Sequence, residues 1–384
     1  MIPDCSHRPP CDGCPRYGEP GIAPAARLAL DGLAAAHDLP PVEVIQGPAT
    51  GFRHRARLAI RGRKGAPKLG LFRAGTHEVV TVPRCVVHHP LINDVAGIVR
   101  GALADAEVPP WSDHAQAGVA RYLQVVVERR SNTAQVVLVA NAAEAAQLAG
   151  CLDRIRDRLD PRLHSLWFNA RSGGGNAILG ERFERWCGAE AVVESFGGAD
   201  VFYPPGAFGQ GNLEVAQAIV ARVREWVPAG AHVAEFYAGV GAIGLSLADK
   251  VGHLRLNEVS PASLRGLDLG LAGLDEATRA RVHVHPGTAG DQAAIAKGAD
   301  VVIADPPRKG LDPALIEQLR AAPPARFLYV SCGLQSLLAD TARLCADGRM
   351  RLTGLQAFDL MPYTEHIETL AVFERAVTVA APMG

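Results

Sequence analysis

The residues with the clearest chemical potential lie in the last third of the chain. A strand-like segment, residues 327–331, is followed by Cys332, and an acidic segment, residues 359–368, ends in Glu368. A thiol at a strand end, with carboxylates able to reach the same cleft, supplies the groups that covalent catalysis needs. A buried, unreactive thiol is the alternative for any single cysteine. Cys332 is therefore a candidate nucleophile, and the neighbouring motifs decide between the two interpretations.

A glycine-rich turn lies upstream, after a predicted strand that ends near Phe236. Residues 234–244 contain the pattern G-x-G-x-x-G, and the next predicted strand ends in Glu258. Glycines at a strand-to-helix turn let a nucleotide approach the backbone, and an acid after the next strand can bind ribose hydroxyls. The pattern fits a nicotinamide dinucleotide or S-adenosyl-L-methionine. Glu235, placed before the glycines, favours the cationic methyl donor over an anionic pyrophosphate.

A second motif follows another predicted strand. Residues 305–310 read DPPRKG, which places Asp305 and a rigid proline pair at the carboxyl end of that strand. Doubly wound sheets bind ligands at the carboxyl ends of their strands. Because Cys332 ends the next predicted strand, we expect both groups to open onto the same edge. Standing alone, the motif would be explained as a turn with a capping aspartate.

The chain of 384 residues is long enough for two domains. Residues 1–200 combine a predicted helix at 24–37 with strands and turns, which indicates a smaller α+β domain. Residues 201–384 alternate strands and helices, which predicts a doubly wound, Rossmann-like α/β domain. No apolar run reaches the length of a membrane span, and the amino terminus lacks signal-peptide features, so we expect a cytoplasmic protein.

The net charge of −1 hides a strongly basic segment. Between residues 51 and 84, nine Lys or Arg residues accompany one acid, Glu78. Arg53, Arg55 and Arg57 alternate with other residues, so a strand would place their charges on one face. This face is either a solvated surface or a strip that contacts phosphates of a nucleic acid.

Four cysteines have a spacing that suggests a metal site: Cys5, Cys11, Cys14 and, far downstream, Cys85. Four thiolates can hold a zinc ion or an iron–sulfur cluster, and spacing alone does not decide between them. Disulfides are uncommon in cytoplasmic proteins, so a disulfide framework is disfavoured.

Together these motifs resemble the RNA uracil-C5 methyltransferases. The resemblance covers F-x-Q-x-N at residues 208–212, the glycine turn, DPPRKG, the Ser-Cys pair at 331–332 and DLMPYTEHIE at 359–368. The four cysteines look like the [4Fe-4S] site of the branch that methylates a loop of 23S ribosomal RNA. Because Cys5 lies almost at the start, we expect no amino-terminal TRAM barrel of the kind some members carry.

The resemblance implies a reaction. Cys332 would add to C6 of a uracil as a thiolate, C5 would attack the methyl group of S-adenosyl-L-methionine, and Glu368 would then remove the C5 proton. The other implied site residues surround the donor or the base, with Glu258 on the ribose: Gln210, Tyr237, Glu258 and Asp305. The chain departs from the family at three places. Gly333-Leu334 replaces Asn-Pro or Asn-Ala, Glu235 replaces Asp, and residues 286–288 (Pro-Gly-Thr) stand where an acid or amide often meets the adenine.

We expect an RNA partner, with a ribosomal RNA loop as the first candidate, and no obligate protein partner. The target uridine must leave its stack to meet Cys332, and the basic strip would hold the RNA backbone. Three alternatives stay open at this point. The substrate could be transfer RNA, the protein could bind nucleotide, zinc and RNA without catalysis, or it could be an oxidoreductase that uses NAD and an iron–sulfur centre.

Overall fold

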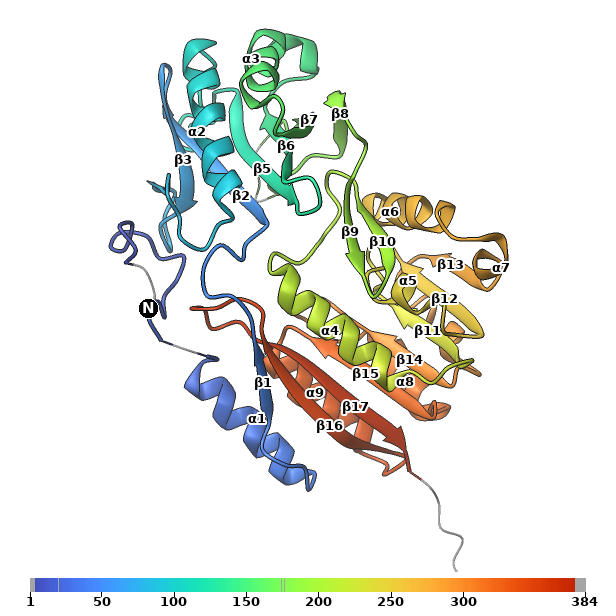
Figure 1. The fold of residues 1–384 in the computed structure, drawn as a ribbon. Helices are drawn as coiled ribbons and strands as arrows, with labels where there is room; N and C mark the ends of the chain where they lie inside the picture. Colours follow the sequence, from blue (N-terminus) through green and yellow to red (C-terminus); the bar gives the residue numbers. More distant parts are fainter. Residues whose placement is uncertain (1–3, 20, 174, 176, 377–384) are drawn as a thin grey trace, which may run out of the picture. The chain divides into compact units, whose positions relative to one another are not determined.

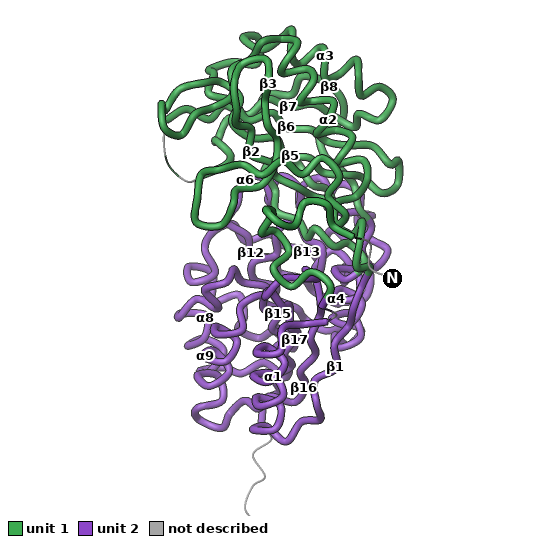
Figure 2. The backbone as a smooth tube through the Cα atoms, turned by 90° about the vertical axis from the view of Figure 1, so that its left-hand side faces the viewer, with its two compact units in different colours: residues 1–18, 48–194, 202–214 green, residues 19–47, 195–201, 215–384 purple. Residues whose placement is uncertain are grey.

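The computed structural model describes residues 4–19, 21–173, 175 and 177–376. The chain forms two compact units, each assembled from segments that are distant in sequence (Figure 2). Unit 1 consists of Met1–Gly18, Pro48–Glu194 and Phe202–Glu214, and unit 2 of Glu19–Gly47, Ser195–Val201 and Val215–Gly384. The division therefore differs from the single boundary near residue 200 that the sequence suggested.

Unit 1 is built on a seven-stranded sheet (Figure 1). All neighbouring strands run antiparallel except β6 and β7, which are parallel. Across the sheet the strands are β4 (Val79–Thr81), β3 (Ala66–Phe72), β2 (Arg55–Arg63), β5 (Ala120–Glu128), β6 (Thr133–Ala140), β7 (Leu163–Ala170) and β8 (Arg182–Gly188). A separate two-stranded sheet pairs β9 (Val192–Phe196) with β10 (Ala199–Tyr203).

Two helices supply the apolar core of unit 1. They are α2 (Pro90–Asp105) and α3 (Ala149–Leu159), the latter preceded by the short helix η1 (Ala145–Leu148). Val99 of α2 and Ile155 of α3 are fully buried and pack in one cluster with inward residues of β2, β5, β6 and β7. Both helices have apolar residues at helical spacing along one side, which is why that side faces the sheet.

Unit 2 is built on an eight-stranded sheet whose central strands are parallel. Toward the edge formed by β1, strand β17 runs antiparallel to both of its neighbours, β15 and β16. Across the sheet the strands are β1 (Glu43–Gln46), β16 (Met350–Asp359), β17 (Glu368–Arg375), β15 (Arg326–Ser331), β14 (Val301–Ala304), β11 (His232–Phe236), β12 (His253–Glu258) and β13 (Val282–Pro286). This is the doubly wound α/β architecture that the sequence predicted.

Helices cover the sheet of unit 2, and in Figure 1 α4 crosses in front of it while α9 lies behind. Leu30, Leu315 and Leu337, from α1, α8 and α9, are fully buried in one core with the strands. The helices are α1 (Pro24–Ala36), α4 (Leu213–Trp226), α5 (Gly244–Leu247), α6 (Pro261–Ala272), α7 (Glu276–Arg279), η2 (Ala293–Ala296), α8 (Pro313–Ala321) and α9 (Leu334–Cys345).

The early segment 19–47 belongs to unit 2 because its strand completes the edge of that sheet. Strand β1 pairs in parallel with β16, with Glu43 opposite Gln356, and α1 buries Leu30 in the core behind the strands. Sequence periodicity predicted the helix at 24–37 but carried no sign of its long-range partner. None of the helices in the described ranges is long and apolar enough to cross a membrane.

Candidate active site

One edge of the sheet in unit 2 collects the candidate catalytic groups. The parallel strands β14 and β15 end side by side, so Asp305 and Cys332 emerge from neighbouring strands at the same edge. Strand β17 runs the opposite way, with Thr369 opposite Ser331, so its first residue, Glu368, lies at that edge too. The structure thus brings together three residues that are up to 63 positions apart in the chain.

The glycine turn after β11 opens onto the same edge. Gly239 and Gly241 have φ of 59° and 87°, a backbone region that favours glycine. The carboxylate of Glu258, at the end of β12, accepts a hydrogen bond from the Gly239 amide at 2.8 Å. It also accepts from the amides of Val259 at 2.9 Å and Ser260 at 2.6 Å. The predicted ribose-binding acid is therefore held in place by one amide of the glycine turn and by the two amides that follow it in the chain.

Tyr237 occupies the first position after β11, with a positive φ of 59°. Its hydroxyl accepts a hydrogen bond from the Asp312 amide at 3.0 Å, and burial raises its pKa. This bond ties the glycine turn to the amino-terminal end of α8. Tyr237 therefore shapes the turn through its backbone and its side chain together.

Glu235 lies beneath the turn and is 1% exposed. A β-carbon at Gly244 would lie 2.2 Å from Glu235 Oε2, which explains why the third glycine of the motif is needed. Burial raises the pKa of Glu235 well above its usual value, and Asp305 and Glu258 add to the rise. Burial therefore disfavours a negative charge on this carboxyl group, and its part in selecting the cationic donor stays a prediction.

Cys332 stands in a partly buried, acidic environment. Burial, together with the carboxyl groups of Glu368 and Asp305, raises the pKa of its thiol to about 11. The Arg308 guanidinium and the amide of Cys332 itself act in the opposite direction. In the free protein the thiol therefore keeps its proton at neutral pH, and a nucleophile forms only when that proton is transferred.

Asp305 and Glu368 form a pair of acids that cannot easily carry charge together. Burial raises the pKa of Asp305 to about 7, and burial together with Asp305 raises that of Glu368 well above its usual value. Glu368 is 3% exposed, and its Oε1 has no hydrogen-bond partner among the described residues. Such a carboxyl group is available to bind or release a proton of a ligand.

Sequence reasoning missed the residues that hold these loops. Asp340 of α9 is buried and accepts hydrogen bonds from the Tyr329 hydroxyl and the Leu311 amide, both at 2.9 Å. Arg308 contacts His366 through its guanidinium. The contacts of Asp340 could have been suspected, because an aspartate on an otherwise apolar helix face needs buried partners. The contact between Arg308 and His366 has no such sign in the sequence, because it depends on folding alone.

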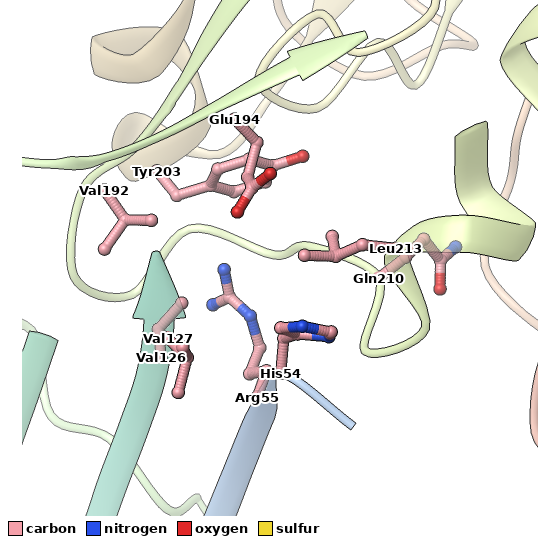
Figure 3. Close-up of a pocket in the computed structure, with 9 residues that line it drawn as sticks. All are labelled: His54, Arg55, Val126, Val127, Val192, Glu194, Tyr203, Gln210 and Leu213. Carbon is pink, nitrogen blue, oxygen red and sulfur yellow. The ribbon is translucent and has the colours of Figure 1, made fainter. Parts of the chain in front are cut away.

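Gln210 belongs to unit 1, whereas the other predicted donor and base ligands lie in unit 2. It lines a small pocket together with His54, Glu194 and Tyr203 (Figure 3). Arg55 points into the same group, where its Nη1 donates to the Ala207 carbonyl at 2.8 Å. The role of Gln210 beside the base stays a prediction.

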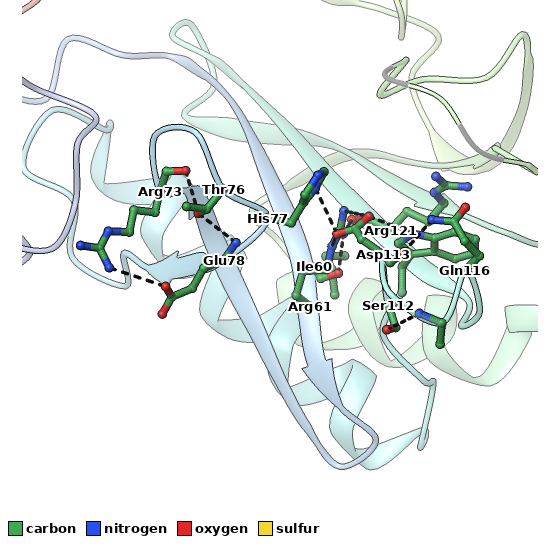
Figure 4. Close-up of polar contacts among 12 residues, drawn as sticks. Ile60, Arg61, Arg73, Thr76, His77, Glu78, Ser112, Asp113, Gln116 and Arg121 are labelled. Carbon is green, nitrogen blue, oxygen red and sulfur yellow. Dashed lines mark hydrogen bonds and ion pairs between the residues drawn. The ribbon is translucent and has the colours of Figure 1, made fainter.

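The basic strip of unit 1 is less uniform than its sequence. Burial lowers the pKa of Arg55 to about 10, and its guanidinium lies 5.4 Å from the centre of the Tyr203 ring. Arg61 is buried and forms a two-pronged ion pair with Asp113 at 2.7 and 3.2 Å (Figure 4). Part of the strip therefore serves the fold, and its exposed members are Arg57, Arg63, Lys64, Lys68, Arg73 and Arg84.

The four predicted metal ligands all belong to unit 1. Burial, together with the charges of Cys85, Cys11 and Cys5, raises the pKa of Cys14 to about 11, which indicates that the thiols lie near one another. The described residues nevertheless contain no group of three or more His, Cys, Asp or Glu side chains positioned to hold a metal ion. The metal site is therefore not confirmed.

Comparisons with known proteins agree with this geometry. Residues 296–376, which carry Asp305, Cys332 and Glu368, match the model of the tRNA (uracil-5-)-methyltransferase family. The chain is 35% identical to an uncharacterized RNA methyltransferase of Protochlamydia amoebophila over 97% of both chains. It is 30% identical to one of Geobacter sulfurreducens over 84% of this chain and 65% of that protein.

A solved structure has the same fold. It is the Pyrococcus abyssi tRNA (uracil-54, C5)-methyltransferase in complex with S-adenosyl-L-homocysteine, with a TM-score of 0.73 and 22% identity over 91% of this chain and 83% of that chain. The predicted family is thus confirmed, whereas its ribosomal RNA branch stays a prediction. Since a relative matches the chain nearly end to end and the family model matches the segment around Cys332, the chain belongs to the RNA uracil-C5 methyltransferase family.

Proposed function

We propose that the protein transfers a methyl group from S-adenosyl-L-methionine to C5 of a uridine in RNA through a covalent bond between Cys332 and C6. The observation that carries this proposal is the meeting of Cys332, Asp305 and Glu368 at one sheet edge, beside a glycine turn. A nucleophile, two carboxyl groups and a nucleotide-binding turn are the parts that this reaction needs.

The donor would bind at the glycine turn. Gly239, where a β-carbon would meet no atom within 4 Å, leaves room for close approach, and Glu258, held by three backbone amides, still offers lone pairs to ribose hydroxyls. The sulfonium of the donor is cationic, so one ionised carboxylate at the same edge would stabilise it. These features support a donor site in unit 2, with Tyr237 at its floor.

Proton movement follows from the pKa order of the site. Cys332 has to lose a proton before it attacks, and Asp305, with a pKa of about 7, is the neighbouring acid that is partly ionised near neutral pH. The proton of the thiol would pass to this carboxylate while the Cys332 sulfur adds to C6 of the uracil. The resulting enolate carbon C5 takes the donor methyl group, and S-adenosyl-L-homocysteine leaves.

Glu368 would complete the reaction. After methyl transfer, C5 still carries its hydrogen, and a base must remove that proton so that the Cys332 sulfur can be eliminated from C6. The buried, unpaired Oε1 of Glu368 at the strand edge supports this role. Burial that raises the pKa of a carboxyl group also makes its carboxylate a stronger base.

We propose 23S ribosomal RNA as the substrate, with transfer RNA as the alternative. The four-cysteine pattern, which resembles that of the ribosomal RNA branch, supports the first. Two names support transfer RNA: that of the matching family model and that of the Pyrococcus abyssi protein. The exposed Lys and Arg residues of unit 1 suit the phosphates of either RNA.

We also propose that Cys5, Cys11, Cys14 and Cys85 hold a [4Fe-4S] cluster, with zinc as the alternative. The nearness of the four thiols and the Gly13 amide, which donates to Cys11 Sγ at 3.5 Å, suit a thiolate cluster. When bound, it would tie the segment before residue 19 to the rest of unit 1. Iron, sulfide and zinc analysis of anaerobically purified protein distinguishes the two, and Cys85→Ala should lose the metal.

A covalent trapping experiment tests the mechanism. Wild-type protein, S-adenosyl-L-methionine and RNA that contains 5-fluorouridine should form an adduct that survives denaturing electrophoresis. With fluorine at C5 there is no proton for the base to remove, so the Cys332 sulfur cannot be eliminated. Cys332→Ala should form none, whereas Cys345→Ala, which removes a thiol from α9 of the same unit, should behave like wild type. If neither ribosomal nor transfer RNA forms an adduct with the wild-type protein, the mechanism is refuted.

The substrate and the rival functions need separate measurements. Mapping of 5-methyluridine in ribosomal and transfer RNA from cells that lack the protein should show one missing site, and its position names the substrate. Equilibrium binding of labelled S-adenosyl-L-methionine and of NAD distinguishes a methyltransferase from an oxidoreductase. Retention of every 5-methyluridine would contradict the proposed activity.

A further inference from the structure

The backbone of Arg308 packs against the loop that carries Cys332. Gly333 follows Cys332, and a β-carbon placed at Gly333 would lie 2.7 Å from the carbonyl oxygen of Arg308. This is closer than a carbon and an oxygen normally approach, so a larger residue would push the two loops apart. The glycine that departs from the family sequence therefore lets the Arg308 loop approach the nucleophile.

The Arg308 side chain is tied to the segment before Glu368. Its Nη2 lies 3.0 Å from Nε2 and 3.2 Å from Nδ1 of His366. Because a guanidinium can only donate, the imidazole nitrogen that receives this bond carries no proton. Arg308 thus links the loop after β14 to the start of β17, the elements that carry Asp305 and Glu368.

The Arg308 loop keeps its shape without help from that side chain. Gly310 has a φ of 85°, and its amide donates to the Pro307 carbonyl at 2.9 Å. The next amide, of Leu311, donates to the buried carboxylate of Asp340 at 2.9 Å. The loop is therefore fixed by its backbone, and a substitution of the Arg308 side chain should leave it in place.

The charged groups that face Cys332 come from three directions. Glu368 at the start of β17 and Asp305 after β14 both disfavour a negative charge on the sulfur, as does burial. Arg308 and the amide of Cys332 favour it. A cation that is already oriented stabilises a developing anion without rearranging during the reaction, and a guanidinium stays charged at every relevant pH.

We propose that Arg308 is a positioning residue for the nucleophile: held by His366 and by its backbone contact with Gly333, its guanidinium stabilises the thiolate of Cys332. This inference rests on the proposed role of Cys332. Lys309, the next residue, provides a matched control, because it has the same charge in the same loop and its side chain is exposed.

Alkylation of Cys332 by iodoacetamide tests the inference in the full-length protein without RNA. The reagent consumes the thiolate, and the tryptic peptide 327–343 contains Cys332 as its one cysteine, so mass spectrometry reports its rate across pH. We expect Arg308→Gln to slow this rate about threefold to tenfold near pH 8, a rise of about 0.5 to 1 pKa unit. Arg308→Lys and Lys309→Gln should stay close to wild type.

His366→Ala gives a second, independent measurement, because it keeps the charge of Arg308 but removes the imidazole that holds the Arg308 side chain in place. We expect Cys332 alkylation to slow by about twofold to threefold, less than in Arg308→Gln. Cys345, alone in the tryptic peptide 344–349, reports on the fold, and its rate should be unchanged in all variants.

An alkylation profile of Arg308→Gln that superimposes on wild type, or equal slowing in Lys309→Gln, overturns the inference. So does an unchanged rate in His366→Ala. The alkylation profile measures the effect of Arg308 whether or not RNA is methylated. Failure of the covalent trapping experiment would therefore count against the proposed function and leave this result standing.

Discussion

Replacing Asp305 with Asn separates the stability of unit 2 from its chemistry. Burial raises the pKa of Asp305 from 3.8 to about 7. Below 3.8 the folded and unfolded chains both hold the proton, whereas between 3.8 and about 7 the folded chain keeps it and the unfolded chain loses it. The free energy of unfolding therefore falls as pH rises through this window and becomes level above it.

The size of this effect follows from the shift. The difference between 3.8 and about 7 corresponds to about 4 kcal/mol, at about 1.4 kcal/mol per pKa unit. The Asp305 residue is partly exposed, so solvent screening reduces this and we expect roughly 2 kcal/mol. Asn has no proton to lose, so the variant should gain that much stability relative to wild type between about pH 4 and about pH 8. For a domain of this size, roughly 4 to 8 °C in the unfolding midpoint corresponds to that gain.

Thermal and urea unfolding of the full chain at several pH values measures the difference. Asp268→Asn, which removes an exposed carboxylate on α6, serves as the control and should follow wild type at every pH. Asp305→Asn should at the same time lose methyl transfer, because the amide cannot accept the thiol proton. If the unfolding curves of Asp305→Asn and wild type shift in parallel with pH, the reasoning about the buried acid is refuted.

Three further predictions use the same site and sheet. Glu368→Gln should lower turnover about a hundredfold to ten-thousandfold while an adduct with unmodified uridine RNA accumulates; rapid release of methylated RNA would contradict its role. Gly244→Ala forces a β-carbon to within 2.2 Å of Glu235 Oε2 and should cost about 1–3 kcal/mol, visible as a lower unfolding midpoint. Burial and His283, whose ring lies 4.7 Å away, lower the pKa of His253, so stability is lost as pH falls below about 6.5. His253→Gln should therefore weaken acid destabilisation between about pH 7 and about pH 5, measured by urea unfolding, and an unchanged slope would exclude that contribution.

Local patterns predicted much of the architecture of unit 2. The runs 301–304 and 327–331 are apolar throughout, as strands buried on both faces must be, and each is followed by a chemically active residue. Because parallel strands end at one edge, the meeting of Asp305 and Cys332 follows from the strand pattern alone. The helix at 24–37 was equally visible, but its place in unit 2 depends on pairing between β1 and β16, some 300 residues apart in sequence.

The sequence by itself determined which chemical groups are present and which strands carry them, because strand periodicity and turn residues are local properties. Tertiary structure decided the protonation and ion pairing of these groups. Burial raises the pKa values of Glu235, Asp305 and Glu368, and repulsion from Asp305 adds to the rise of the other two. Arg61 forms an ion pair with Asp113 in the interior rather than facing solvent. Desolvation and charge pairing depend on which distant segments surround a group, and that information exists only once the chain has folded.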